Sequence, residues 1–191
     1  LAKRLSDADI GSIALVEAGG RTGDARTIVP QWYPRLFGSR YDWNYVTEAV
    51  PGLQQRRLPW PRGKLLGGSG AINALIYLQA SQSDFNRWGW DWAESLVERE
   101  LLQHWSPPDL HPWSDAFLAA CQDMGLARTP RFTRAAASTA GAFVTTQQSG
   151  RRIHSGEGLL DAERWRRLTV IVQQAAGRIV LQGGRAVAVE V

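Results

Sequence analysis

The segment RGKLLGGSGAINALIY, residues 62–77, places three glycines and a serine between a basic start and an apolar run. Glycine at this density lets a backbone come close to another group, because no Cβ stands in the way. The segment is not a Walker loop, since Gly63-Lys64 stands first and no lysine precedes Ser69. Residues 71–78 predict a helix, whose first N–H groups would favour an anion. The segment therefore predicts either a site for a phosphate-bearing ligand or a tight turn packed against its own core.

A second constraint is the segment SIALVEAGG, residues 12–20, which follows what we interpret as the last turns of a helix at residues 1–5. Its run of Ile, Leu and Val predicts a strand buried on both faces, as in a parallel sheet. A strand that ends in an acidic residue such as Glu17 is half of a dinucleotide-binding unit, in which the carboxylate accepts hydrogen bonds from ribose hydroxyls. The glycine-rich turn of such a unit lies about 20 residues earlier, so we expect it to fall before residue 1. A glutamate at a strand edge, without a ligand, is the alternative.

Further helices are predicted over residues 91–104 and 114–124, the second with Ser114 as N-cap and Gly125 as its stop signal. The weakly patterned residues 131–142 predict a loop. From residue 168 the sequence predicts strands, and the pair GG at 183–184 suits a two-residue hairpin turn. This order of elements predicts a mixed α/β fold that ends in an antiparallel hairpin.

The formal charge of the chain is +4, and 20 of its 22 basic residues are arginine. Nucleic-acid binding requires a stripe or patch of positive charge, but the arginines are spread along the chain. The densest groups, Arg151-Arg152 and residues 164–167, are short. We therefore predict a solvated arginine-rich surface, with contacts to a phosphate backbone as the alternative, and no nucleic-acid partner.

Cysteine and histidine do not form a recognisable site. Cys121 is the single cysteine and lies in a helical pattern, which predicts a buried core residue. His104, His111 and His154 lack metal-ligand spacing, so we predict no metal site and assign each histidine to the surface or to packing. No apolar run reaches the roughly 18 residues of a membrane span, and no signal peptide is recognised. We expect a cytoplasmic location.

Taken together, the glycine-rich segment and LQASQSDFNRW after it resemble the first signature of the glucose-methanol-choline (GMC) oxidoreductases, flavoproteins that oxidise alcohols. The positions that match the signature are Gly63, Lys64, Leu66, Gly67, Gly68, Ser69, Gly70, Ile72, Asn73, Tyr77, Ala80 and Asn86. ALVEAGG resembles the second strand of the family, and VTTQQSGRRIHS and LTVIV resemble later segments. The resemblance covers most of the chain, is weakest at residues 97–110 and 131–142, and points to the choline-dehydrogenase-like subgroup.

The resemblance implies a partial FAD-binding Rossmann-like domain over residues 1–105, part of the substrate domain over 106–160, and a return to strands of the FAD domain over 161–191. It implies that Glu17 binds the adenosine ribose, and that the backbone of the glycine loop contacts the pyrophosphate and the flavin. The implied cofactor-binding residues are Glu17, Ala18, Gly63, Leu65, Gly67, Gly68, Ser69, Asn73, Ala74, Leu75, Ile76 and Ala176. Ala176 stands where the family has a valine whose backbone contacts adenine. Some relatives attach flavin to a histidine where this chain has Ile72, so the resemblance implies non-covalent FAD.

In the family, a hydride passes from the alcohol carbon to flavin N5, and a histidine paired with a second His or Asn handles the hydroxyl proton. That pair lies well beyond Val191 in relatives, so we expect no catalytic residue in this chain. The resemblance implies an FAD-dependent oxidoreductase acting on CH–OH groups, present here as an incomplete portion. The alternatives are a non-catalytic flavin- or protein-binding remnant, and a basic module unrelated to redox chemistry. We expect a small-molecule alcohol as substrate. Because a Rossmann sheet without its first strand exposes an edge, we also expect self-association or a complementing chain.

Overall fold

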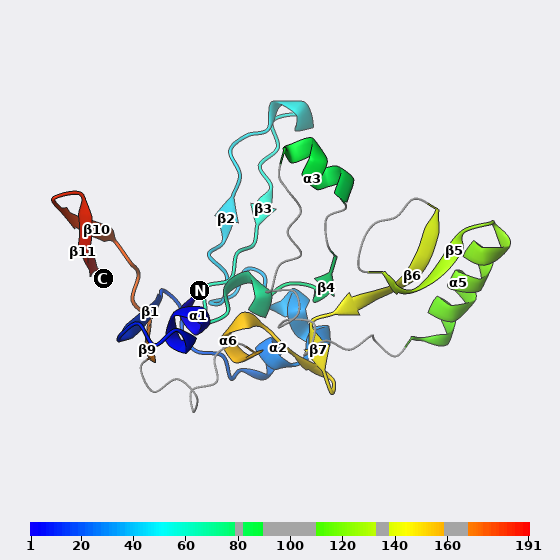
Figure 1. Cartoon of the computed structure of the whole chain (residues 1–191). Helices are drawn as coiled ribbons and strands as arrows, with labels where there is room; N and C mark the ends of the chain where they lie inside the picture. Colours follow the sequence, from blue (N-terminus) through cyan, green and yellow to red (C-terminus); the bar gives the residue numbers. More distant parts are fainter. Residues whose placement is uncertain (79–81, 90–109, 133–137, 159–167) are drawn as a thin grey trace. The chain divides into compact units, whose positions relative to one another are not determined.

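The computed structural model describes residues 1–78, 82–89, 110–132, 138–158 and 168–191 (Figure 1). The predicted helix over residues 91–104 and His104 lie outside these ranges. The chain divides into two compact units, of which the first comprises Leu1–Ala74 with Arg152–Val191 and the second Leu75–Arg151. The division into cofactor and substrate regions at residues 105 and 160 stays a prediction.

The first unit is built around a parallel pair of strands. Its elements are α1 (Ala2–Asp7), β1 (Ile13–Glu17), α2 (Ala25–Ile28), the 3-10 helices η1 (Pro30–Arg35), η2 (Pro51–Leu53) and η3 (Gly68–Ala71), β2 (Tyr45–Val46), β3 (Pro59–Trp60), α6 (Ser155–Gly158), β9 (Leu168–Val172), β10 (Arg178–Gln182) and β11 (Arg185–Glu190). Strands β1 and β9 lie side by side, with Ile13 opposite Leu168 and Glu17 opposite Val172. The predicted helix end, the parallel strand and its acidic terminus are confirmed. The side chains of β1 are at most half-buried, so burial on both faces is not found in the described chain.

The late hairpin is also confirmed. Strands β10 and β11 pair in antiparallel fashion, with Gln182 opposite Arg185. Gly183 and Gly184 have φ of 57° and 76°, which is the left-handed pair that a primed two-residue turn requires. The fold class is therefore mixed α/β with a terminal antiparallel hairpin, as the sequence predicts.

A small core holds the first unit together. It joins three residues of the glycine-rich segment to two residues that precede it in the sequence. Its members are Leu36, Tyr41, Leu65, Ala71 and Ile72, each no more than 5% exposed.

The second unit comprises β4 (Ile76–Tyr77), α3 (Gln82–Trp88), α5 (Pro112–Asp123), β5 (Ala127–Phe132), β6 (Thr139–Thr145) and β7 (Gln147–Gln148), which pairs with β8 (Arg151–Arg152). Strand β6 lies between β4 and β5. An apolar groove of about 700 Å³ is lined by residues of α5 and β6, among them Phe117 and Phe143. Cys121 is buried in α5, as predicted.

Three local predictions are wrong. Residues 71–78 form no helix: the chain leaves η3 at Ile72, and Leu75 has a φ of 64°, which a helix cannot contain. Helix α5 begins at Pro112 rather than after Ser114, because the His111 Nδ1 atom accepts the Trp113 N–H and proline suits the first helical turn. The predicted loop over 131–142 is instead partly occupied by β6, which begins at Thr139. Among the described residues, no helix has the length and apolar character to cross a membrane.

Candidate functional site

The end of strand β1 packs directly against the start of the glycine loop. The Gly20 carbonyl accepts the Leu66 N–H at 2.9 Å. A Cβ on Gly19 would lie 1.9 Å from the Lys64 carbonyl oxygen and 2.6 Å from the Leu65 nitrogen. Gly19 is therefore glycine because two backbone segments touch there, and this contact fixes the loop beside the acidic strand end.

The loop is also folded on itself. A Cβ on Gly63 would lie 2.2 Å from the Gly68 carbonyl oxygen, and the Gly63 N–H donates to the Ser69 hydroxyl at 3.1 Å. Gly67 faces the imidazole of His154, which is 6% exposed. The tight-turn interpretation is thus correct for Gly63 and Gly67, whose missing side chains make room for the chain's own atoms.

Gly68 is the exception. Its φ is +55°, and a Cβ there would meet nothing within 4 Å. It opens η3, a turn of four residues in which the Ile72 N–H donates to the Ser69 carbonyl. So short a turn lacks the aligned dipoles of an α-helix, and the helix-terminus anion site expected from the sequence is not formed. The open side of Gly68 remains the place where a ligand could come close to the loop backbone.

A hollow of about 420 Å³ joins Gly68 to the acidic end of β1, and we call it the Glu17 hollow. Its lining residues are Leu1, Ala2, Lys3, Leu15, Glu17, Leu66, Gly67, Gly68, Ser155 and Gly156. The Glu17 Oε1 atom accepts the Gly19 N–H at 2.8 Å, which orients the carboxylate. The carboxylate is half-buried, so its oxygens can still accept hydrogen bonds from a polyhydroxyl ligand in the hollow.

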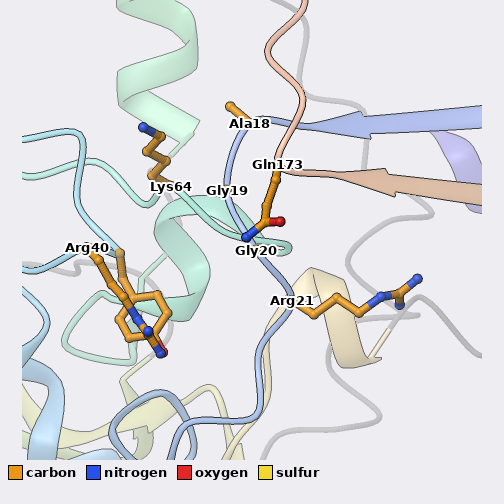
Figure 2. Close-up of a pocket in the computed structure, with 8 residues that line it drawn as sticks. Ala18, Gly19, Gly20, Arg21, Arg40, Lys64 and Gln173 are labelled. Atoms are coloured by element: carbon orange, nitrogen blue, oxygen red, sulfur yellow. The ribbon is translucent and has the colours of Figure 1, made fainter. Parts of the chain in front are cut away.

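A second hollow, also about 420 Å³, lies around Ala18, Gly19 and Gly20 (Figure 2). Gln173 lines it, and its backbone N–H donates to the Gly19 carbonyl at 2.8 Å, so the chain after β9 closes over the end of β1. Tyr41 also lines it, together with three cationic residues: Arg21, Arg40 and Lys64. Figure 2 shows their charged ends pointing in different directions. The hollow is therefore lined by positive charge, but the three charged groups do not converge on one point.

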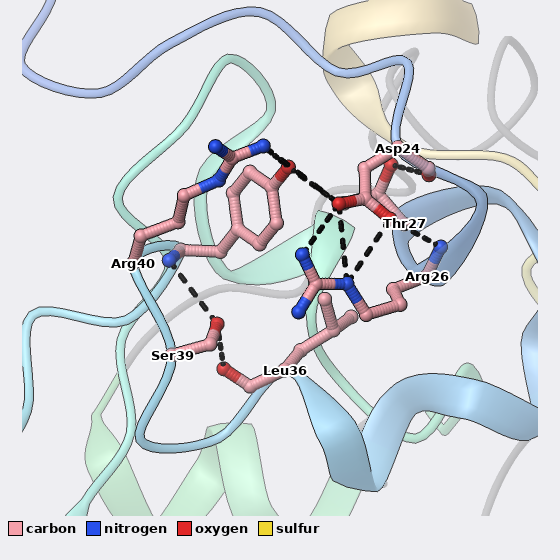
Figure 3. Close-up of polar contacts among 7 residues, drawn as sticks. Asp24, Arg26, Thr27, Leu36, Ser39 and Arg40 are labelled. Atoms are coloured by element: carbon pink, nitrogen blue, oxygen red, sulfur yellow. Dashed lines mark hydrogen bonds and ion pairs between the residues drawn. The ribbon is translucent and has the colours of Figure 1, made fainter.

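A polar network anchors Arg40 (Figure 3). Its guanidinium donates to the Tyr41 hydroxyl at 2.6 Å, which in turn donates to Asp24 at 3.0 Å. Asp24 caps α2 by accepting the Arg26 N–H, and it binds the Arg26 guanidinium at 2.6 Å. These hydrogen bonds, with that to the Arg26 side chain the strongest, hold the pKa of Asp24 far below its usual range.

Arg152 is completely buried. Its guanidinium donates to the Gly70 carbonyl and to both oxygens of Asn73. The expected solvated surface is therefore wrong for Arg152, because its buried donors find acceptors on Gly70 and Asn73 instead of water. No pattern in the sequence predicts this role; the only signal is the position of Arg152 inside a segment that resembles the family.

The structure brings together most of the predicted cofactor-binding residues in the first unit. Glu17, Gly67 and Gly68 share the Glu17 hollow, and Ala18 lines the second hollow. Leu65 is fully buried, and its carbonyl accepts the Gly68 N–H at 2.8 Å. The others in this unit are Gly63, Ser69 and Asn73 in or next to the loop, Ala74, and Ala176 between β9 and β10. Leu75 and Ile76 belong to the second unit, where the Leu75 carbonyl accepts the Thr146 N–H at 2.9 Å. The contacts of these residues with a cofactor stay predictions.

Of the two histidines in the described chain, His111 lies at the surface and His154 is buried in packing, as predicted. His111 caps α5, and the His154 Nδ1 atom accepts the Gly156 N–H at 3.1 Å. Within the described ranges, no group of three or more His, Cys, Asp or Glu side chains could hold a metal ion.

Comparison with known proteins decides the family. The sequence profile described as GMC oxidoreductase matches residues 12–191. The chain belongs to the GMC oxidoreductase family. It is 31% identical to an oxygen-dependent choline dehydrogenase of Rhizobium etli, over all of this chain and 39% of that protein. It is 32% identical to an uncharacterized GMC-type oxidoreductase of Mycobacterium bovis, over all of this chain and 41% of that protein.

Solved structures of GMC-type fold agree with this assignment. Pyridoxine 4-oxidase from Mesorbium loti superimposes with a TM-score of 0.79 at 26% identity, covering 99% of this chain and 42% of the other. A formate oxidase superimposes with a TM-score of 0.78 at 20% identity, covering 95% of this chain and 37% of the other, which shows the fold alone. The GMC-type chain therefore spans about two fifths of the length of the curated relatives it matches.

Proposed function

We propose that this chain forms the FAD-binding part of a flavin-dependent oxidoreductase that acts on CH–OH groups. The observation that carries the proposal is that Glu17 and Gly68 line the same hollow although they are far apart in sequence. A carboxylate that accepts hydroxyl hydrogen bonds and a backbone open to close approach are the two features that a ribose and a phosphate require. Membership of the GMC oxidoreductase family supports FAD as the ligand, and one solved relative, from Chaetomium thermophilum, is an FAD-dependent oxidoreductase.

Within the proposed site each residue has a separate task. Glu17 would accept hydrogen bonds from the ribose hydroxyls, with Oε1 already oriented by Gly19. The backbone at Gly67 and Gly68 would lie against the phosphates or the flavin, and Asn73 would contribute polar contacts at the end of the turn. Bound FAD would supply the acceptor for the hydride that leaves the alcohol carbon.

We further propose that FAD binds without a covalent bond to this loop. Ile72 occupies the position at which some relatives carry a flavin-linked histidine. Its side chain is 2% exposed within the core and has no nucleophilic atom. Denaturation in acid should therefore release the whole flavin from the polypeptide, and flavin that stays with the precipitated protein would contradict this mode of binding.

A flavin-binding role without catalysis by this chain alone is the second candidate. The Nδ1 atoms of His111 and His154 each accept a backbone hydrogen bond, and both rings serve packing or capping. Neither is arranged as a general base for an alcohol proton. Under this alternative the chain would retain FAD but show no turnover.

The decisive experiment adds FAD to the purified chain and measures retained flavin absorbance after gel filtration. Gly68→Val should abolish retention, because the new side chain fills the open approach to the loop. Gly150→Val is the matched control, since Gly150 also has a left-handed φ, of 71°, and open space around it. Equal retention by both variants would contradict the site.

Turnover separates the two candidates. Choline, pyridoxine and simple primary alcohols, offered with an artificial electron acceptor, test oxidation of CH–OH groups. Stoichiometric FAD with turnover supports the oxidoreductase, whereas stoichiometric FAD without turnover supports the non-catalytic role.

A further inference from the structure

Arg152 is a buried cation without a buried anion. Its side chain is fully shielded from solvent, and no carboxylate of the described chain forms an ion pair with it. Its Nε atom has no hydrogen-bond partner among the described residues. Burial lowers the pKa of Arg152 to about 10, so the guanidinium is still protonated near neutral pH. Burying a charge without an opposite charge costs free energy. The groups that Arg152 binds should therefore explain why it is buried.

Those groups are the acceptors at one end of the glycine loop. Nη1 donates to the Gly70 carbonyl at 3.1 Å and to the Asn73 Oδ1 atom at 2.9 Å. Nη2 donates to the Asn73 carbonyl at 2.7 Å. The Asn73 N–H is tied to the Ser69 carbonyl at 3.0 Å. Arg152 thus binds both ends of the turn over residues 70–73 with one guanidinium.

The contact also determines which way the Asn73 amide faces. A guanidinium has N–H donors and no acceptor. The amide atom that faces Arg152 must therefore be the oxygen, and the NH₂ group is directed away from the guanidinium. Asn73 itself is exposed, and its NH₂ group lies on the side of the amide opposite Arg152.

We propose that Arg152 is a positioning residue for cofactor binding, which fixes the turn over residues 70–73 and orients Asn73 as a hydrogen-bond donor to acceptor atoms of the flavin nucleotide. This inference rests on the proposed function of the glycine loop. It assigns a role to a residue that touches no part of the Glu17 hollow and acts through Asn73.

Three variants of the full chain test the proposal by FAD titration and thermal melting. Arg152→Met removes the charge and all donors while keeping a long side chain. Arg151→Met is the matched control, because Arg151 is the exposed neighbour. Asn73→Asp keeps an oxygen for Arg152 and gives the cation an anionic partner, but removes the N–H donors. The carboxylate of Asn73→Asp would repel the phosphates of FAD. Titrations in about 0.5 M salt screen this repulsion.

We expect FAD to bind Arg152→Met at least about tenfold more weakly, as for other residues that orient a binding group, and to bind Arg151→Met unchanged. Asn73→Asp should melt no lower than the unmodified chain and yet bind FAD at least about tenfold more weakly. Intact FAD binding by Asn73→Asp would show that the Asn73 N–H groups do not bind the cofactor, and that result would overturn the proposal even if Arg152→Met fails to fold. Absence of FAD binding by the unmodified chain would instead overturn the proposed function, and this inference with it.

Discussion

Gly67 lies so close to His154 that a Cβ at position 67 would fall 2.2 Å from the His154 Nδ1 atom. The same ring is fixed by the hydrogen bond from the Gly156 N–H. The backbone of the glycine loop therefore packs directly against the His154 ring, and no space remains for a side chain at position 67.

Gly67→Ala should destabilise the chain by more than about 2 kcal/mol, because it combines overlap with a fixed ring and a left-handed φ of +98°. Gly68→Ala is the control: its φ is also left-handed but its surroundings are open, so about 1 kcal/mol is expected. Urea unfolding followed by tryptophan fluorescence measures both. Equal midpoints for the two variants would contradict the contact.

Gly19→Ala should prevent the end of β1 from meeting the glycine loop, since the new Cβ would lie 1.9 Å from a backbone oxygen. We expect a loss of at least about 3 kcal/mol in the free energy of unfolding. Gly20→Ala, where a Cβ meets nothing within 4 Å, should change stability by less than about 1 kcal/mol. Hydrogen exchange of the Leu66 N–H, which the Gly20 carbonyl accepts, provides a local readout. Slow exchange at Leu66 in Gly19→Ala would be the contrary result.

Acid should destabilise the first unit through Asp24 and Asp42. The hydrogen bond from the Arg26 side chain lowers the pKa of Asp24 below 3.8. Burial raises the pKa of Asp42, but backbone N–H groups of Gly38, Arg62 and Asn44 together lower it below 3.8. A carboxylate whose pKa is lowered by folding adds stability above its unfolded pKa, and this stability is lost as the pH falls through the folded value.

The free energy of unfolding should therefore be constant from pH 7 to about pH 5 and should fall below about pH 4. Asp24→Asn should cost about 1 to 2 kcal/mol at pH 7 and should weaken the acid dependence. Asp7→Asn, which removes an exposed pair with Lys3, should change stability by less than about 0.5 kcal/mol. Chemical denaturation at stepped pH tests this, and an unchanged pH dependence in Asp24→Asn would refute it.

Glu17→Gln should leave the fold intact but weaken FAD binding. The glutamine oxygen can still accept the Gly19 N–H, whereas the negative charge that strengthens hydrogen bonds from ribose hydroxyls is lost. We expect a roughly tenfold higher dissociation constant, measured by quenching of flavin fluorescence. Unaltered affinity would mean that the ribose does not lie at Glu17.

The sequence by itself determined the features that depend on residues near one another in the chain. The apolar run before Glu17 produced a parallel strand, and Gly183-Gly184 produced a hairpin turn. The glycine-rich segment also identified the family, because its residue types at fixed spacing are specific. These predictions succeeded because propensity and turn chemistry are local.

Only the tertiary structure decided what each glycine faces and where charges are buried. Gly19, Gly63 and Gly67 pack against the chain, whereas Gly68 opens to a hollow, a difference that no local pattern contains. Residues 71–78 have a helical pattern, yet the left-handed Leu75 and the pairing of β4 with β6 override it. Arg152 is buried although its neighbour Arg151 is exposed. In each case the deciding atoms come from a distant segment, and long-range contacts outweigh local preference.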